Sequence, residues 1–369
     1  MRASPRPLEA KRIVVRLPNW LGDVVMATPG LRAIREAWPD ARLVTQVRAG
    51  LAPLLEGSGL CDEIWPLSLG QGGGRGGRAD VRRLASGHFD LGIVIPESVS
   101  SALLMRLGRV QRVVGFARDP LRRWLLHEVA PAPAAWGRRR LVSRERFVLT
   151  LAAHVIGRTL DPTPAALRLS LGVTEGEEAR LEAALRAAGT SPDDLRQSPP
   201  VVIAPGASFG PAKCWPATAY AALADLLVGR GESVVLLGGP GEAERVAAVR
   251  EAMTRDAVVL AGTLDVGALK ALLRDTRLLV ANDAGTRHVA AAFSVPSVVF
   301  FGPTSVAKTA DHLDRVTVLE SQHACRPCYR RRCPIDHRCL RSIGVEEAWQ
   351  ASTAALDRAR GASCRSSRP

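Results

Sequence analysis

The sequence predicts an α/β protein with two doubly wound parallel sheets, and three observations lead to this fold class. Short apolar runs alternate with segments whose apolar residues recur at helical spacing, which is typical of β-α-β units. The alternation occurs twice, on either side of a middle section rich in arginine and proline. The length of 369 residues suits two domains. We expect one domain over residues 1–185 and another over 186–344, with a ligand cleft between them, and a helix and tail over 345–369.

The first half opens with a strand over residues 12–17, which Pro18 closes. A helix is expected over 24–37, where apolar residues recur every three or four positions until Pro39 stops the pattern. Three more apolar runs complete the first predicted sheet, at residues 42–47, 63–67 and 91–95.

The middle section is expected to be mostly helical, with helices over 147–157 and 175–188 and a proline-containing linker over 191–200. The strand–helix pattern then restarts. The strands of the second predicted sheet are residues 201–204, 233–237, 258–260, 277–280 and 297–301. The helices that alternate with them are expected at 217–229, 242–253, 266–273 and 286–293, and a last helix at 345–360.

The basic charge of the chain has two explanations. The formal net charge is +14, and only four of the 50 basic residues are lysines. Arginine-rich composition is one explanation, and attraction to a polyanion (nucleic acid, an anionic membrane surface or a phosphorylated substrate) is the other. Nucleic acid is disfavoured, because aromatic residues make up only 4% of the chain and the basic residues are dispersed.

Composition also excludes several classes of protein. Apolar residues form 47% of the chain, which excludes wholesale disorder, and seven cysteines are too few for a disulfide scaffold. The first 17 residues are charged and lack an apolar segment, so we expect no signal peptide. The uncharged run 289–307 contains Pro296 and Pro303, and is typical of a helix end and a buried strand rather than a membrane span. We expect a cytoplasmic protein.

Asp23 is the first candidate for chemistry. It lies in Pro18-Asn-Trp-Leu-Gly-Asp23, between the first strand and its helix. Aspartate at a helix start often only caps the helix. A carboxylate at the end of a sheet is also placed to take a proton from a substrate hydroxyl.

The loop after residues 201–204 contains the parts of a phosphate site. Gly206 and Gly210 allow close backbone approach, Ser208 offers a hydroxyl and Lys213 a cation before a helix. No Gly-Lys-Ser/Thr occurs, so this is not a Walker A loop. The alternative for Lys213 is a solvent-exposed lysine on a long loop.

Two other strand ends offer polar residues. Glu242 follows the glycine-rich turn 238–241 and either holds ribose hydroxyls or only stabilises a helix start. In the segment 280–288, Asn282, Asp283, Gly285 and Thr286 precede or open a helix, where backbone amides bind a diphosphate. The alternatives there are plain turn formers and, for His288, a packing histidine.

Four cysteines fall within fifteen residues, at Cys325, Cys328, Cys333 and Cys339. Thiolates at such spacing bind zinc or an iron–sulfur cluster, and reduced thiols are the alternative. The segment also holds five arginines, which form a basic patch able to meet phosphates. They are Arg326, Arg330, Arg331, Arg332 and Arg338.

The pattern Gly72-x-Gly74-x-x-Gly77 matches a dinucleotide-binding motif as text. It lies in the low-complexity run 70–78 and does not follow the first strand of either predicted sheet, so we interpret it as a flexible loop.

Together these segments resemble the ADP-heptose:lipopolysaccharide heptosyltransferases of glycosyltransferase family 9, the type II members most closely. The resemblance runs from about residue 13 to 349. The segments that carry it are Asn19-Trp-Leu-Gly-Asp23, Pro205-Gly-Ala-x-Phe-Gly-Pro-Ala-Lys-x-Trp-Pro216, Asn282-Asp-Ala-Gly-Thr-Arg-His288, Phe301-Gly-Pro-Thr304 and the cysteine segment.

The resemblance implies a GT-B fold: two Rossmann-like domains facing a central cleft, with the acceptor in the first and the donor in the second, and a last helix that returns to the first domain. It implies that Asp23 is the general base, that Lys213 binds the donor diphosphate and that Glu242, with Glu244 as its rival, binds the ribose. Further donor contacts are implied for Ser208, Asp283, Ala284, Gly285, Thr286 and His288, and acceptor contacts for Asn19, Trp20 and Gly22. Ala284 stands where the family often has Ser or Thr, so one hydroxyl contact is missing.

The activity that the resemblance implies is inverting transfer of heptose from ADP-heptose to a lipid A–Kdo–heptose acceptor, at the cytoplasmic face of the inner membrane and without a required cofactor. Another family 9 transferase with a different donor or acceptor is the alternative. A nucleic-acid-binding protein is the less favoured one. We expect positive charge to concentrate on the acceptor-side domain and on the loop 326–338.

Overall fold

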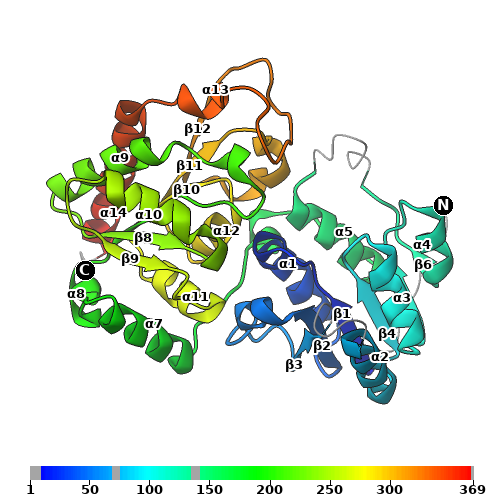
Figure 1. Cartoon of the computed structure of the whole chain (residues 1–369). Coiled ribbons are helices and arrows are strands. Elements are labelled where there is room, and N and C mark those ends of the chain that lie inside the picture. Colours follow the sequence, from blue (N-terminus) through cyan, green and yellow to red (C-terminus); the bar gives the residue numbers. More distant parts are fainter. Residues whose placement is uncertain (1–9, 69–74, 134–141, 367–369) are drawn as a thin grey trace. The chain divides into compact units, whose positions relative to one another are not determined.

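The computed structural model describes residues 10–68, 75–133 and 142–366 (Figure 1). The chain divides into two compact units. The first contains Met1–Gly172 and Ala307–Asp311, and the second contains Val173–Val306 and His312–Pro369. The division falls before the expected boundary at residue 185, because helix α7 (Glu175–Ala187) packs on helix α11 (Val266–Arg274) of the second unit.

The first unit contains one parallel sheet in the order β3-β2-β1-β4-β5-β6. The predicted strands β1 to β4 are confirmed, whereas β5 and β6 were not predicted: β5 lies in a stretch that was assigned to no element, and β6 lies in the section that was expected to be mostly helical. The strands are β1 (Arg12–Arg16), β2 (Arg42–Arg48), β3 (Glu63–Leu67), β4 (Leu91–Val94), β5 (Arg112–Gly115) and β6 (Glu128–Val129).

Helices cover this sheet. They are α1 (Leu21–Ala37), η1 (Ala49–Leu54), α2 (Arg75–Gly87), α3 (Val99–Leu107), α4 (Pro120–Leu125), α5 (Arg144–Ile156) and α6 (Pro164–Leu167). The flexible-loop interpretation is wrong for residues 75–78, which begin α2, while 70–74 lie outside the described residues. Helix α2 is held by burial of Leu84 and by Asp80, whose carboxylate accepts the backbone N–H of Ser68 at 3.1 Å.

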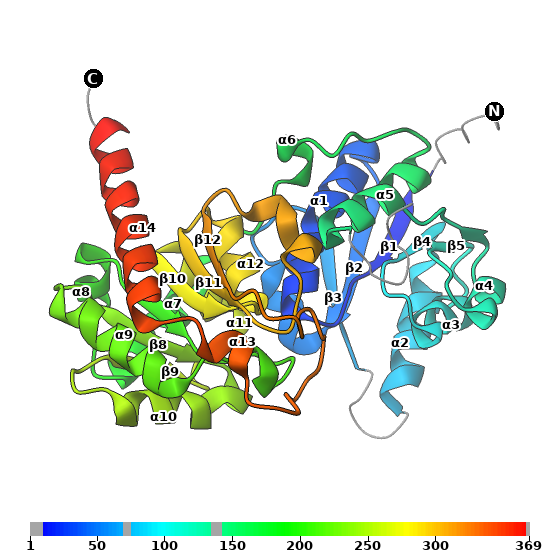
Figure 2. The same ribbon diagram turned by 90° about the horizontal axis from the view of Figure 1, so that it is seen from above.

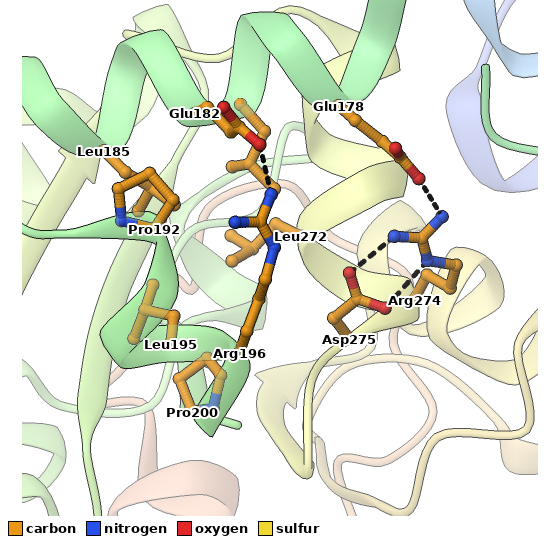
Figure 3. A pocket seen from close by; sticks show the side chains of 11 residues that line it. Glu178, Glu182, Leu185, Pro192, Leu195, Arg196, Pro200, Leu272, Arg274 and Asp275 are labelled. Carbon is orange, nitrogen blue, oxygen red and sulfur yellow. Dashed lines mark hydrogen bonds and ion pairs between the residues drawn. The ribbon is translucent and has the colours of Figure 1, made fainter. Parts of the chain in front are cut away.

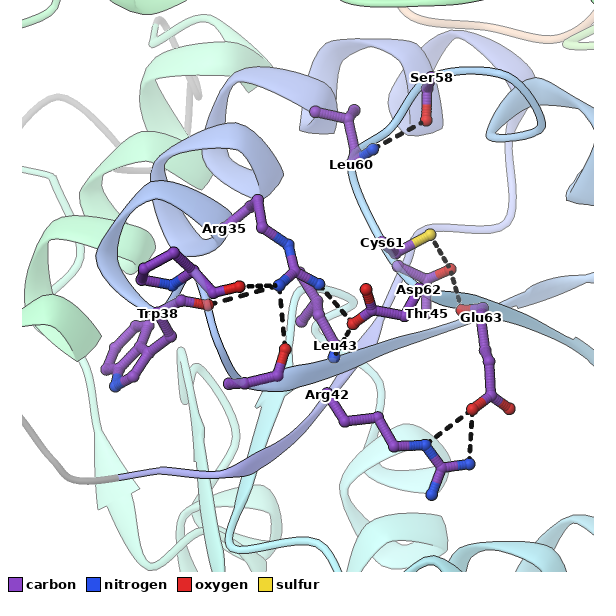
Figure 4. Close-up of polar contacts among 12 residues, drawn as sticks. Arg35, Trp38, Arg42, Leu43, Thr45, Ser58, Leu60, Cys61, Asp62 and Glu63 are labelled. Atoms are coloured by element: carbon purple, nitrogen blue, oxygen red, sulfur yellow. Dashed lines mark hydrogen bonds and ion pairs between the residues drawn. The ribbon is translucent and has the colours of Figure 1, made fainter.

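Helix α1 is fixed along its length, which sets the position of the residues at its start. It packs on α5, and Gly30 permits the close approach, since a Cβ there would lie 2.5 Å from Val148. At its far end the Arg35 guanidinium donates to the carbonyl oxygen of Ala41 at 2.9 Å and to the Asp62 carboxylate at 2.5 Å (Figure 4). The same carboxylate accepts the backbone N–H of Leu43 in β2 at 2.6 Å, so α1 is tied to the sheet.

The second unit repeats the topology of the first. Its parallel sheet has the order β12-β11-β10-β7-β8-β9, so in chain order both sheets run 3-2-1-4-5-6. The predicted strands β7 to β11 are confirmed, and β12 is additional. The strands are β7 (Val201–Ala204), β8 (Val234–Gly238), β9 (Val258–Ala261), β10 (Leu278–Asn282), β11 (Ser297–Phe301) and β12 (Val316–Glu320).

Besides α7 and α11, the helices that follow in the chain are α8 (Pro192–Gln197), η3 (Pro211–Lys213), α9 (Ala217–Gly229), η4 (Pro240–Glu242), α10 (Ala243–Ala252), α12 (Gly285–Ala292), η5 (Val306–His312), α13 (Arg338–Arg341) and α14 (Val345–Ser366). The expected linker 191–200 therefore contains a helix, which Ser191 caps. Among the described residues no helix has the length and apolar character needed to cross a membrane.

The last helix does not return to the first unit as expected. Helix α14 packs on α9, β10 and β11, and Figures 1 and 2 both show it beside α9. Its residues Ala348, Ala355 and Leu356 are buried in the second hydrophobic core. The correction has a physical reason: the apolar stripe of α14 covers one face of the second sheet, which would otherwise be exposed to water.

In a sheet of this strand order, ligands bind where the order reverses, beyond the carboxyl ends of the two central strands. These strands are β1 and β4 in the first unit and β7 and β10 in the second. The predicted Asp23, Lys213 and Asp283 follow three of these four strands.

Candidate active site

Asn282, the last residue of β10, ties the loop after β7 to the end of β10. Its side chain is fully buried, and Nδ2 donates to the carbonyl oxygens of Pro205 at 2.8 Å and Gly206 at 3.2 Å. Its Oδ1 accepts the backbone N–H of Trp215 and the hydroxyl of Tyr220, both at 3.0 Å. Asn282 therefore holds the predicted loop after β7 against the predicted segment 280–288. Sequence reasoning did not predict this role.

Lys213 and Asp283 meet at this edge of the sheet. The Lys213 ammonium donates to Asp283 Oδ2 and to the Asp283 carbonyl oxygen, each at 2.7 Å. The two side chains are only 13% and 10% exposed. Lys213 is thus not the solvent-exposed lysine of the alternative interpretation.

The Asp283 carboxylate is stabilised in its ionised form. Burial alone would raise its pKa, but the charges of Lys213 and Arg287 and the hydrogen bonds from Lys213 and Thr304 hold the pKa well below its usual range. The Thr304 hydroxyl donates to Oδ2 at 2.7 Å and Arg287 Nε to Oδ1 at 3.1 Å. A carboxylate with this many donors is a fixed anchor for Lys213.

The start of α12 offers donors to an anion. Its N-cap is Ala284, and no side chain caps the helix. The positive end of the helix dipole and the first backbone amides are therefore available to an anion. The buried hydroxyl of Thr286 in the first turn has no hydrogen-bond partner among the described residues. The Lys213–Asp283 pair and this uncapped helix start lie next to each other, because Asp283 and Ala284 are adjacent in the chain.

The next two residues, Arg287 and His288, are buried and incompletely paired. Arg287 is fully buried, and its Nη1 and Nη2 have no hydrogen-bond partner in the described part of the chain. His288 is 4% exposed, and its Nδ1 has no hydrogen-bond partner among the described residues either. Burial first, and then the charge of Arg287, hold the pKa of His288 well below its usual range, so its ring is neutral. Sequence reasoning missed Arg287, although its position four residues after Asp283 on a helix was a usable signal.

Glu242 and Ser208 lie on the neighbouring loops. The Glu242 carboxylate accepts the backbone N–H of Gly239 at 3.0 Å and lies against Gly206, where an added Cβ would come within 2.2 Å of it. Glu244 is exposed on α10, and Ser208 is exposed in the loop after β7. The structure therefore brings Glu242, rather than Glu244, to the loop that leads to Lys213.

In the first unit, Asp23 lies at the third position of α1, and the N-cap is Trp20. The capping interpretation of Asp23 is therefore wrong. The Asp23 side chain is half-buried and forms no hydrogen bond or ion pair with a described residue. Asn19 and Trp20 are exposed, and Asn19 Oδ1 accepts from Arg16 Nη2 at 2.6 Å. Asp23 thus combines a fixed backbone with a half-buried carboxylate that no described residue pairs.

Comparison with known proteins gives the family of the chain. The model of glycosyltransferase family 9 (heptosyltransferase) matches residues 78–338. The chain belongs to this family. It is 30% identical over 303 residues to lipopolysaccharide heptosyltransferase 2 of Escherichia coli K12, which covers 80% of this chain and 83% of the relative. The lipopolysaccharide heptosyltransferase 2 of Salmonella typhimurium is 30% identical over 307 residues, with the same coverage.

Solved structures show the same fold as this family 9 chain. The E. coli ADP-heptose lps heptosyltransferase II superposes with a TM-score of 0.77 at 26% identity, covering 94% of this chain and 99% of that one. A family 9 glycosyltransferase from Veillonella parvula superposes with a TM-score of 0.80 at 22% identity, covering 96% and 100%. The two six-stranded parallel sheets are those of the GT-B fold, as expected.

The cysteine segment of this family 9 chain packs against the loops of the candidate site. The backbone N–H of Ala212 donates to the carbonyl oxygen of Arg331 at 3.1 Å, and that of Tyr329 to Pro303 at 2.9 Å. Gly210 makes the first contact possible, because a Cβ there would lie 2.5 Å from the Arg331 oxygen. Among the described residues no three His, Cys, Asp or Glu side chains are placed to hold a metal ion, so metal binding by the four thiols stays a prediction.

A hollow elsewhere in the second unit contains none of the predicted site residues. It lies between α7, α8 and α11 and is open to solvent (Figure 3). Its lining includes Leu185, Leu195 and Leu272, and its rim charges are paired, as in Arg274 with Glu178 at 2.5 Å. The structure gives it no unpaired group that would select a ligand.

Proposed function

We propose that this chain transfers L-glycero-D-manno-heptose from ADP-heptose to the inner core of lipopolysaccharide, placing a second heptose on the first. The observation that carries the proposal is the Lys213–Asp283 pair beside the uncapped start of α12, in a family 9 chain similar to proteins named heptosyltransferase 2. A cation and free helix amides at one point suit the diphosphate of a nucleotide sugar.

We propose that the donor binds the second unit. Lys213 and the amides of Gly285 and Thr286 take up the negative charge that develops on the departing diphosphate. Glu242 accepts from the ribose hydroxyls. Ser208, Asp283, Ala284 and His288 line the same donor site. No sugar hydroxyl can bind a side-chain oxygen at Ala284.

We propose that Asp23 is the general base. It removes the proton from the acceptor hydroxyl as that oxygen attacks the anomeric carbon opposite the diphosphate, which inverts the configuration. A positioned base contributes about 10²–10⁴-fold to the rate. Asn19, Trp20 and Gly22, in the same loop, are proposed to contact the acceptor.

The proposed reaction has no required metal, because Lys213 and the helix amides supply the positive charge. Turnover that persists in EDTA supports this, and loss of turnover that Mg²⁺ restores contradicts it. Elemental analysis of anaerobically purified protein tests zinc or iron at Cys325, Cys328, Cys333 and Cys339 separately.

The acceptor is a membrane lipid, so we propose a cytoplasmic protein that associates peripherally with the inner membrane and binds no nucleic acid. By sequence, the first unit has 27 Lys+Arg against 15 Asp+Glu and the second has 23 against 21, which gives formal charges of +12 and +2. The unit that carries the proposed acceptor residues therefore has most of the +14. No gel shift with DNA or RNA at physiological salt is expected.

The test of the function is a transfer assay. Purified protein is incubated with ADP-heptose and lipopolysaccharide cores that end in no heptose, one heptose or two. We expect ADP release and a mass increase of one heptose with the one-heptose core. No ADP release above background with any core would contradict heptosyl transfer. Release with a different core, or with another nucleotide sugar only, would favour a different family 9 transferase.

A further inference from the structure

Helices α3 and α4 of the first unit present apolar side chains to solvent. Seven large hydrophobic side chains are exposed among the described residues, and four of them lie on these two short helices. Trp124 is 84% exposed, Leu121 60%, Leu107 55% and Leu103 41%. Clustered exposed apolar residues mark interaction surfaces, whereas single ones do not.

The spacing of these residues places them on the outward faces of their helices. Leu103 and Leu107 are four residues apart on α3, while Ala102 and Met105 are buried under it. On α4, Leu121 and Trp124 are three residues apart. Figures 1 and 2 both show α3 and α4 side by side, and residue contacts join them.

A buried arginine holds α4 in this orientation. Arg122 is fully buried, and its guanidinium donates to the carbonyl oxygen of Phe116 at 2.6 Å and to the hydroxyl of Ser101 at 3.1 Å. It also donates to the carbonyl oxygen of Ser98, the N-cap of α3. With Arg122 turned inward, Leu121 and Trp124 are fixed outward.

Positive charge surrounds the apolar residues. Arg106 on α3 and Arg123 on α4 are exposed, and neither forms an ion pair with a described acidic residue. Of the nearby acids, Glu128 is paired with Arg112 and His154, whereas Asp119 accepts the backbone N–H of Leu121 at 2.8 Å and keeps its charge. Arg106 contacts the His127 ring. The surface therefore combines tryptophan and leucine with two arginines that form no ion pair with a described acid.

We propose that the α3–α4 surface, formed by Leu103, Arg106, Leu107, Leu121, Arg123 and Trp124, docks the protein on an anionic lipid bilayer. Tryptophan and leucine enter the interfacial region, and arginines bind lipid phosphates. The +12 charge of the first unit opposes self-association through this face and attracts anionic lipid. The inference deepens the proposed function, since it names the surface that brings the transferase to its lipid acceptor.

The test is sedimentation of the full-length protein with vesicles of phosphatidylcholine alone or with added phosphatidylglycerol. Wild type is expected to bind the anionic vesicles more tightly, with affinity that falls as salt rises. The double variant Leu107→Ser/Trp124→Ser is expected to bind them roughly 10-fold more weakly or worse. Arg106→Glu/Arg123→Glu is expected to lose a similar factor and most of the salt dependence.

Two matched controls should bind like wild type. Leu226→Ser changes a leucine on α9 of the second unit that is 41% exposed, as Leu103 is. Arg158→Glu reverses an exposed arginine in the first unit. Wild-type protein that ignores anionic vesicles, or surface variants that bind as tightly as the controls, would overturn the proposal. So would a wild-type dimer that Leu107→Ser/Trp124→Ser converts to monomer in analytical ultracentrifugation, because the face would then bind a second copy.

A soluble, deacylated acceptor separates this inference from the proposed function. With that acceptor, Leu107→Ser/Trp124→Ser is expected to turn over like wild type. If wild type fails to use it but still binds vesicles, the proposed transfer fails and the docking surface stands. If wild type turns over but does not bind vesicles, only the docking surface fails.

Discussion

The Lys213 ammonium binds both the side chain and the backbone carbonyl of Asp283, at 2.7 Å in each case. The two residues come from loops after β7 and β10, which are neighbouring strands at the reversal of strand order. This double contact fixes the position of a cation beside the uncapped start of α12. In the proposed reaction the charge is in place before the donor diphosphate binds, and little reorganisation is needed when the bond to the sugar breaks.

Replacing Lys213 by alanine should therefore lower kcat strongly, by about 10²–10³-fold, since the departing diphosphate loses its cation. Affinity for ADP, measured by titration calorimetry, should also fall. Lys11→Ala removes an exposed lysine in the first unit and serves as the control. Equal kcat in Lys213→Ala and Lys11→Ala would remove Lys213 from the proposed site.

Asp23→Asn should abolish most turnover while leaving ADP affinity unchanged, because the proposed base lies in the first unit and the proposed donor site in the second. The expected loss is about 10²–10⁴-fold in kcat. Asp40→Asn changes an exposed aspartate in the turn after α1 and should turn over normally. Unchanged turnover in Asp23→Asn would exclude the base role, and a loss of ADP binding would point to unfolding instead.

Glu242→Gln should weaken ADP binding by about 10–100-fold, the value of a hydrogen bond to a charged group. Glutamine keeps the side-chain volume that packs on Gly206, so the loop should stay in place. Glu244→Gln, on the exposed face of α10, should bind ADP within twofold of wild type. Titration calorimetry with both variants decides whether Glu242 or Glu244 binds the ribose. Weaker ADP binding by Glu244→Gln than by Glu242→Gln would assign the ribose to Glu244.

The sequence was sufficient for most of the fold because both sheets are parallel and buried, so their strands are continuous apolar runs. It missed β12, a partly exposed edge strand at residues 316–320, of which only Leu319 is buried. It also misplaced α14. Helical periodicity identifies an apolar stripe but not the sheet that the stripe covers.

The sequence allowed candidate site residues to be named, but not the contacts between them. Strand ends and small residues identified Lys213 and Asp283 as neighbours of an anion. Their mutual ion pair joins residues 70 positions apart, which no local pattern indicates. The contacts of Asn282 with Pro205 and of Thr304 with Asp283 were missed for the same reason, since each joins residues that are distant in the sequence.

The lowered pKa of the buried His288 leads us to expect that the free energy of unfolding depends on pH. Because its pKa is lowered on folding, the unfolded chain binds a proton below about pH 6.5 that the folded chain does not. Stability should therefore fall as pH decreases below 6.5, by up to about 1.4 kcal/mol per pH unit. Asp283 has the usual depressed pKa of an acid, so its contribution is lost only under much more acidic conditions.

His288→Asn should make this dependence shallower. The measurement is urea unfolding of wild type and variant at pH 7.5, 6.5 and 5.5. Subtracting the two curves removes contributions from other histidines, including the exposed His127, whose pKa is also lowered. Identical slopes for the two proteins would show that His288 is protonated equally in the folded and unfolded states.

The ion pair between Lys270 and Glu177 joins α11 to α7, with an N–O distance of 3.0 Å and no exposure of either side chain. Lys270→Met should destabilise the second unit by about 3–5 kcal/mol, because it leaves the Glu177 carboxylate buried without its cation. Glu177 Oε2 also accepts the backbone N–H of Thr174 at 2.9 Å. Glutamine can keep that bond, so Lys270→Met/Glu177→Gln should recover much of the loss.

The control is Arg274→Met, which breaks a half-exposed pair with Glu178 on the same two helices and should cost at most about 1 kcal/mol. Urea unfolding of the four proteins measures these differences, and a double variant no more stable than Lys270→Met would show that lost packing, rather than the uncompensated charge, causes the effect.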